Sequence, residues 1–375
     1  MSHQYLTDTA RPCPRLLWAR NILLLFILLC LGGCSEIAYY GQAVQGELHL
    51  LAAREPIPRL LQNPSTPAPL RRNLAGIEQL RRFARDQLDL PVGDNYSTYV
   101  ALERPYVVWN LVASQPLALK AYTWCYPVIG CHGYRGFFHE ADAQALATKL
   151  KAKGLDTWVG GVPAYSTLGW FDDPVLSTFW DYPETARAGL VFHELAHRIL
   201  FVKGDTTFNE SFATTVQDEG MRRWLQQRGT PAQRQAWVRG QQRQAQIDQW
   251  QNDTVRQLQT VYGDASLGDN EKRQQKAHIL LEAQTRLKAL ISRWPGVSSD
   301  WLNTPLNNAK LMALQHYTGD IPAFHALLAR CNGQLPAFYN AARQLAERVP
   351  KARRAALQQL QQTAAAPAGP FRCQP

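Results

Sequence analysis

Apolar residues recur every three or four positions along much of the chain, the spacing of helices with one buried face. The pattern predicts helices over about 36–53, 71–88, 140–153, 184–202 and 209–227. A stretch rich in Gln, Arg and Ala at about 231–293 has sparse apolar anchors, and glycines interrupt it near its middle. We interpret it as a long helical hairpin that serves as a solvated scaffold. Further helices are expected at about 303–317, 321–331 and 335–363.

Segments rich in branched and aromatic residues are fewer, and they predict strands. The strand candidates are Tyr106–Val112, Leu117–Trp124 and Asp156–Val162. Prolines at 56, 58, 64, 67 and 69 predict a linker between the first two helices. A mostly helical chain with a small sheet belongs to the α+β fold class.

Charge changes this picture little. The chain has 375 residues, enough for one large domain or two smaller ones, and a formal net charge of +10. Removal of the first 33 residues, which hold three Arg and one Asp, leaves about +8. No run of five basic residues occurs. We therefore expect the basic side chains on solvated helix faces and no nucleic acid among the partners.

The N-terminus has the features of an export signal. Three arginines, at 11, 15 and 20, precede the ten apolar residues Ile22–Leu31, a stretch too short to span a bilayer. The next residues end in Gly33-Cys34 and resemble the lipobox of bacterial lipoprotein signal peptides. The resemblance implies cleavage before Cys34, a lipid on its sulfur and an acylated amine. The alternative is an uncleaved N-terminal anchor.

Ser35, and not Asp, follows the lipobox cysteine. By the sorting habit of such lipoproteins, this favours a lipid anchor in the outer membrane of the bacterial cell envelope, facing the periplasm.

Four cysteines remain after the signal and the lipidated residue: Cys125, Cys131, Cys331 and Cys373. An even number in an oxidising compartment predicts two disulfides, for which three connectivities exist. We favour Cys125 with Cys131, which closes a small loop, and Cys331 with Cys373, which pins the tail. A zinc site formed by Cys125, Cys131 and His132 is the rival interpretation, although it lacks the two-residue spacing of structural zinc sites.

The motif HELAH at 193–197 carries the clearest chemistry. On a helix, His193 and His197 project from one face, where both imidazoles can bind one Zn²⁺. Glu194 lies beside the metal and can take a proton from water. A catalytic zinc needs a third protein ligand. The candidate is Glu210, within Asn209-Glu210-Ser211-Phe212-Ala213.

This second motif resembles the helix that supplies the third ligand in zinc aminopeptidases of the gluzincin clan. Glu210 occupies the matching place, Ser211 stands where Gly is usual, and the gap to HELAH is shorter than in that clan. The resemblance implies a zincin-like catalytic domain that binds one Zn²⁺ per chain through His193, His197 and Glu210. It implies that Glu194 accepts the proton of the attacking water and delivers it to the leaving amine.

A closer resemblance covers most of residues 35–345. Its segments are Ala164–Pro174, Phe192–His197, Phe208–Thr214, Asn307–Leu311 through Tyr317, and Pro322–Phe324. Together they resemble a family of predicted bacterial aminopeptidases, often lipoproteins. The resemblance implies a membrane-anchored zinc metallopeptidase that acts on peptides or proteins.

Other residues are candidates around this centre. Tyr165 and Tyr317 are candidate donors to the oxyanion formed during hydrolysis. Residues 157–163 form either an edge strand that pairs with an extended peptide, with Gly160-Gly161 allowing close backbone approach, or an ordinary core strand. Asp172 and Asp173 would orient a ligand or a substrate amine, or cap the loop before Pro174, and we favour the cap.

These inferences divide the chain into four parts. They are a signal peptide at 1–33, N-terminal helices with the linker at 34–100, the zinc-peptidase region at 101–345 with the hairpin inserted, and a helix end with an Ala/Pro tail at 346–375.

Two questions remain open at this point. Aminopeptidase and endopeptidase share the mechanism, and the GxMEN segment with which gluzincin aminopeptidases bind the substrate's ammonium is absent. The other alternative is a non-catalytic lipoprotein, a scaffold or binding protein with a structural metal site.

Overall fold

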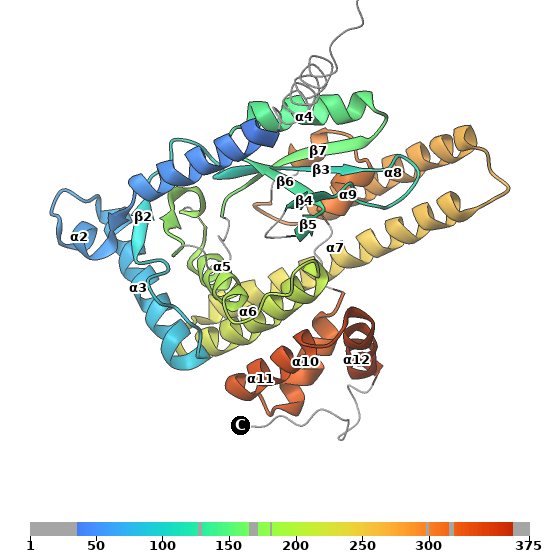
Figure 1. Ribbon diagram of the computed structural model, residues 1–375. Coiled ribbons are helices and arrows are strands. Elements are labelled where there is room, and N and C mark those ends of the chain that lie inside the picture. The colour runs from blue at the N-terminus through green and yellow to red at the C-terminus, as the bar shows by residue number, and fades with distance from the viewer. Residues whose placement is uncertain are drawn as a thin grey trace, which may run out of the picture. The chain divides into compact units, whose positions relative to one another are not determined.

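A computed structural model describes residues 36–126, 130–164, 172–180, 182–297, 300–314 and 319–362 (Figure 1). The chain divides into two compact units, 1–52 and 53–375. Within the first unit, residues 36–52 form the helix predicted from the apolar spacing. All elements described below belong to the second unit. Among the described residues, no helix combines the length and the apolar character that crossing a membrane requires.

The proline-rich segment predicted as a linker contains structure. A two-residue strand β1 (Glu55–Pro56) leads into helix α2 (Ile57–Gln62), and α3 (Ala68–Leu88) follows. The linker prediction was wrong because the prolines occupy the first turns of both helices, where no backbone N–H is needed. A small sheet joins β1 to β2 (Thr98–Val100) and then to β8 (Val175–Leu176).

The sheet nearest the candidate chemistry has the strand order β6-β3-β7 and is antiparallel. Its strands are β6 (Tyr134–Phe137), β3 (Val108–Ser114) and β7 (Asp156–Val162). Two of the three predicted strands are therefore confirmed. Helix α4 (Glu140–Ala152) connects β6 to β7 and packs against β3 and β7. Within the described part of the chain, β7 pairs with β3 alone and is an edge of this sheet.

The third predicted strand, Leu117–Trp124, is wrong. The chain turns after β3, makes an isolated bridge between Ser114 and Ala121, and forms the hairpin of β4 (Trp124–Tyr126) and β5 (Gly130–His132). The carbonyls of Gln115, Pro116 and Ala118 accept hydrogen bonds from the Asn308 side chain, which binds this turn of the chain.

A disulfide between Cys125 and Cys131 crosses the β4–β5 hairpin. This is the small loop expected from the spacing of the two cysteines, and it excludes a zinc site on their sulfurs. Cys331 is buried and disulfide-bonded. Cys373 lies outside the described residues, so its pairing with Cys331 stays a prediction.

Helices α5 (Glu184–His197) and α6 (Thr206–Arg228) pack side by side. Phe192 from α5 and Phe208 and Phe212 from α6 are fully buried. The first helix was predicted to run to 202 but ends at His197. The Asn209 side chain explains the difference, because it bonds the N–H and the C=O of Val202 at 2.7 and 2.8 Å and fixes a turn there.

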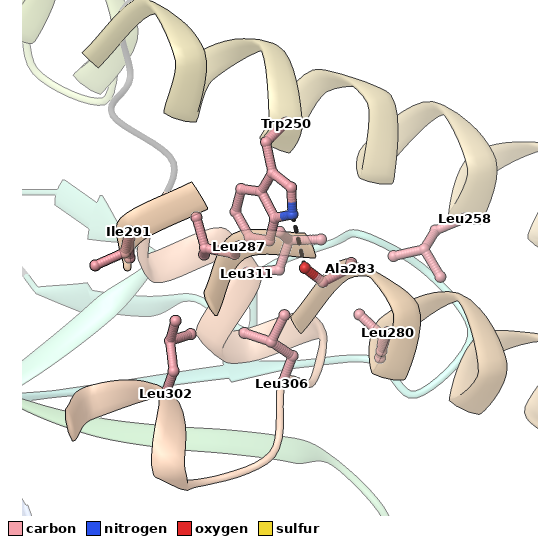
Figure 2. Close-up of a cluster of buried hydrophobic side chains, with 9 residues drawn as sticks. All are labelled: Trp250, Leu258, Leu280, Ala283, Leu287, Ile291, Leu302, Leu306 and Leu311. Carbon is pink, nitrogen blue, oxygen red and sulfur yellow. Dashed lines mark hydrogen bonds between the residues drawn. The ribbon is translucent and has the colours of Figure 1, made fainter. Parts of the chain in front are cut away.

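The long hairpin is confirmed as α7 (Pro231–Gly263) and α8 (Asp269–Ile291), but it is more than a solvated scaffold. Nine buried residues form an apolar cluster where the hairpin meets the segment that follows it (Figure 2). They are Trp250, Leu258, Leu280, Ala283, Leu287, Ile291, Leu302, Leu306 and Leu311. The Trp250 indole N–H donates to the carbonyl of Ala283 at 2.9 Å, so even its polar atom is satisfied inside the cluster (Figure 2).

After the hairpin, the described residues form four further α-helices. They are α9 (Asn308–Ala313), α10 (Ile321–Arg330), α11 (Leu335–Ala346) and α12 (Pro350–Gln362). One helix was predicted over 335–363, but the described residues of this range form two, because Pro350 has no N–H to donate and disfavours a helical residue before it. The chain is thus a mostly helical α+β protein, as predicted.

A polar cluster around Asn308 joins the hairpin to the sheet. The Asn308 side chain is fully buried, donates to Gln115 O at 3.0 Å and accepts from the Tyr262 hydroxyl of α7 at 2.8 Å. Its backbone N–H donates to Asp156 Oδ2 of β7 at 2.9 Å. Lys276 of α8 donates to the same carboxylate oxygen at 2.5 Å. Strand β7 is therefore bonded to α8 and α9, and α7 is bonded to α9.

We expect Asn308→Ala to lower the free energy of unfolding by about 2–4 kcal/mol, because it leaves buried carbonyls and the Tyr262 hydroxyl without a partner. Urea denaturation measures the change. The matched control is Asn340→Ala at an exposed position of α11, which should change stability by less than about 0.5 kcal/mol. Equal effects of the two substitutions would show that the cluster does not contribute.

Candidate metal centre

The end of α5 and the start of α6 carry the three residues predicted to bind zinc. His193 and His197 lie one turn apart on α5, and Glu210 lies in the first turns of α6. Asp205 caps α6 by accepting from the N–H of Phe208 at 3.2 Å. The two hydrogen bonds of the Asn209 side chain to the Val202 backbone, which we call the Asn209 clamp, act together with this cap. They fix the eight-residue turn between the helices.

The three side chains converge on one point. His193 Nε2 lies 3.1 Å from Glu210 Oε2 and 3.3 Å from His197 Nε2, and His197 Nε2 lies 3.7 Å from Glu210 Oε1. Ligands bound tetrahedrally at about 2.0–2.1 Å are separated by about 3.3–3.4 Å. Two imidazoles and a carboxylate at these distances fit a single metal ion, and three ligands leave a fourth position for water or substrate.

Burial shapes the electrostatics of this centre. The exposed fractions of the His193 and His197 side chains are 17% and 6%. Burial opposes the charged imidazolium of His193, but its hydrogen bond to the Glu210 carboxylate and the charges of Glu194 and Glu210 outweigh this effect and raise the pKa of His193. Burial and the neighbouring His193 lower the pKa of His197 to about 4. In the metal-free protein His197 is therefore neutral at pH 7, the form in which an imidazole binds metals.

Glu194 lies in the same buried region. Burial raises its pKa to about 7; the charge of His193 opposes this shift, and the charges of Glu210 and Asp173 add to it. A carboxyl group whose pKa is close to neutrality can both accept and deliver a proton.

The sequence did not reveal a network of buried hydrogen bonds near Glu194. Asn95, which is 1% exposed, accepts from the N–H of Asp173 at 3.0 Å and from Arg198 at 3.0 Å. The next residue, Tyr96, is buried and has a left-handed backbone with φ of 58°. Burial and the charges of Glu194 and Asp173 raise its pKa. The only signal in the sequence was the turn-forming Gly93-Asp94-Asn95, which has no catalytic meaning by itself.

The other predicted site residues have different outcomes. Tyr165 and Tyr317 lie outside the described residues. The side chain of Asp172 accepts from Asn95 at 3.2 Å and lies 3.6 Å from Arg198, which directly follows His197. Asp172 therefore links the end of α5 to the loop after α3, and its role as a local cap stays a prediction.

A cavity of about 310 Å³ separates the sheet from the metal centre and is lined by both. An aromatic ring lies over each of the two glycines of β7, and pairing of this edge strand with a peptide stays a prediction. A Cβ atom on Gly160 would lie 1.9 Å from the Trp158 indole, and one on Gly161 would lie 2.1 Å from the Tyr106 ring. The indole therefore lies against the strand at the wall of the cavity.

The sequence of this chain matches a known protein family over most of its length. The family model described as "Putative aminopeptidase" matches residues 38–357. The chain belongs to this family. The match covers both ligand helices, the sheet, the hairpin and most of α12, and membership supports a peptidase-like function. No curated protein and no solved structure matches the chain.

The Asn209 clamp yields a prediction about the turn that separates the ligands. In Asn209→Ala, the amide of Val202 loses its acceptor, and we expect its hydrogen exchange to accelerate at least tenfold, about 1.4 kcal/mol of local stability. Exchange measured by mass spectrometry on peptides covering 198–205 tests this. Asn252→Ala, at an exposed position of α7, is the matched control and should leave that segment unchanged. Normal protection in Asn209→Ala would contradict the clamp.

Proposed function

We propose that this protein is a zinc-dependent metallopeptidase. The observation that carries the proposal is the convergence of His193, His197 and Glu210 to ligand-to-ligand distances, with the half-buried Glu194 next to His193 in the chain. The donor set, two imidazoles and a carboxylate, is that of catalytic zinc in hydrolases, and family membership supports peptide substrates.

A bound zinc ion would polarise the scissile carbonyl and lower the pKa of a water molecule. The remaining work belongs to the protein. Glu194 is placed to accept the proton of the attacking water and to transfer it to the leaving amine, because its buried environment favours the protonated form more than water does. His193 and His197 are held in place by the packed faces of α5.

We further propose a lipid anchor at Cys34 and a position in the bacterial cell envelope, facing the periplasm. The lipobox-like sequence 31–34 supports the anchor. The disulfide between Cys125 and Cys131 supports an oxidising compartment.

We expect the chain to bind about one Zn²⁺, with loss of binding in His197→Ala, which removes one of three ligands. Elemental analysis of the purified protein gives the stoichiometry, and thermal unfolding with and without a chelator gives the linked stabilisation. His278→Ala replaces an exposed histidine of α8 and should retain the metal. Full zinc content in His197→Ala would contradict the assigned ligands.

Substitution of Glu194 should separate metal binding from hydrolysis. We expect Glu194→Gln to retain zinc and to lose at least about a hundredfold in peptide hydrolysis, because the amide cannot accept the proton. Hydrolysis is followed by mass spectrometry on a peptide library. A variant that cleaves as fast as the parent would exclude Glu194 as the base, whereas a zinc-loaded parent that cleaves nothing would exclude the proposed activity.

A further inference from the structure

Two cavities meet at the candidate metal centre, and His193 and Thr214 line both. One, of about 310 Å³, lies against the face of the β6-β3-β7 sheet. The other, of about 490 Å³, lies between α6, α7 and α10. A peptide chain that fills both cavities therefore passes His193, so the chemistry of the two walls indicates what kind of substrate the centre accepts.

The cavity at the sheet has an apolar wall. Val112 of β3, Tyr134 of β6, Trp158 of β7 and Met312 of α9 line it. The ring of Trp158 lies over Gly160, in the space that any larger residue at 160 would fill. Aromatic and thioether side chains around a cavity favour an apolar side chain as its occupant.

The cavity at α7 carries two aspartates on its wall. Asp218 of α6 and Asp248 of α7 line it, and no Lys or Arg occurs among the described residues around it, although the chain as a whole carries a net charge of +10. Gln241 donates to Asp218 at 3.1 Å, and Gln244 donates to Asp248 at 2.8 Å. The partly buried Trp237 contributes an aromatic ring to the same wall.

His325 also lines this cavity, with Nε2 lying 3.5 Å from Asp218 Oδ2. Among the described lining residues, only His325 and His193 of the metal centre can become cationic. Two carboxylates, amide groups and an indole form the environment that binds an ammonium or guanidinium group.

The length of α6 decides which cationic group fits. Asp218 lies eight residues beyond Glu210 on the same helix, and at 1.5 Å per residue their backbones are about 12 Å apart along the axis. The α-amine of a residue lies only about 2.5 Å from its own carbonyl carbon. Asp218 is therefore too far from the centre to bind the amine of the residue whose carbonyl is attacked.

Two substrate groups can span this distance. An extended peptide advances about 3.3–3.6 Å per residue, so an N-terminal ammonium two or three residues farther along the chain can reach the carboxylates. The side chain of a lysine or arginine near the cleaved bond supplies the same kind of charge on a long stem.

We propose that the centre acts on peptides that place an apolar side chain against Trp158 and a cationic group between Asp218 and Asp248, with the cleaved bond between them. This inference rests on the proposed peptidase function for the cleaved bond, but the two binding preferences are independent of catalysis. It assigns to the first half of α7 the wall of a substrate site.

Peptide binding to the zinc-loaded Glu194→Gln protein tests the inference without requiring turnover. The probes are fluorescent peptides, blocked at both ends, with one Phe and one Lys separated by zero to three alanines in either order. In matched peptides Met replaces Lys, or Ala replaces Phe. A further set carries a free N-terminus in place of the lysine, which distinguishes the two sources of positive charge.

At the best spacing, we expect the cationic peptide to bind at least tenfold more tightly than its neutral match. The ratio of the two Kd values should fall close to one when Asp218→Asn and Asp248→Asn are combined. It should persist in Asp253→Asn, which removes an equal charge from a part of α7 outside the cavity. Trp158→Ala should abolish the preference for Phe over Ala, and Trp158→Phe should largely retain it.

Thermal unfolding and zinc content verify that each variant is folded. No cationic preference in the parent, or a preference that survives both Asn substitutions, would overturn the inference. A Phe preference that survives Trp158→Ala would overturn it as well. A zinc-loaded parent that binds with both preferences but hydrolyses none of the peptides would instead contradict the proposed function.

Discussion

The side chain of Asn209 holds the turn on which the candidate centre depends. HELAH places two imidazoles on α5, but a third ligand is useful only if α6 returns within about 4 Å of them. Asn209 binds both backbone groups of Val202, and the adjacent Glu210 then faces His193. Because one buried amide satisfies a donor and an acceptor of the turn, it fixes both the end of α5 and the start of α6.

The C-terminal helices reinforce the same turn. Arg353 of α12 is buried and binds Asp205 through two nitrogens, at 2.9 and 2.8 Å, while Asp205 caps α6. A buried guanidinium needs such a partner, since an unpaired charge inside a protein is strongly unfavourable. The ion pair therefore ties α12 to the turn between α5 and α6.

The sequence was sufficient where local spacing determines structure. The HELAH helix, strand Asp156–Val162 and the hairpin with its break near Gly263 all followed from periodicity and turn residues. The sequence was insufficient where side chains that are distant in sequence determine the local backbone structure. Asn308 donates to the carbonyls of residues 115, 116 and 118, where the chain turns and does not continue as the predicted strand, and no local pattern reveals these bonds. The prolines between 56 and 69 led to the wrong prediction of a linker, because the first turn of a helix tolerates proline as readily as a linker does.

The candidate ligands could be named from motifs, but the surroundings of the centre could not. Asn95 lies in a loop far before α5 in the sequence, and Asp173 lies in the segment just before α5. Asn95 bonds Asp173 and Arg198, but in the sequence both Asn95 and Asp173 are ordinary turn residues. The Gln-rich hairpin shows the same limit more strongly. Its apolar anchors are too few to indicate a core, yet Trp250 and Leu258 are buried together with residues of α8 and of the segment that follows the hairpin. The part of α7 around Trp250 and Leu258 is packed into this core, and Gln241 of α7 is bonded to Asp218 of α6. The polar face of the first half of α7 therefore forms a wall of the cavity beside His193. A helix that composition marks as solvated scaffold is thereby suited to select a substrate by charge, because a polar wall can distinguish charged groups that an apolar core cannot admit.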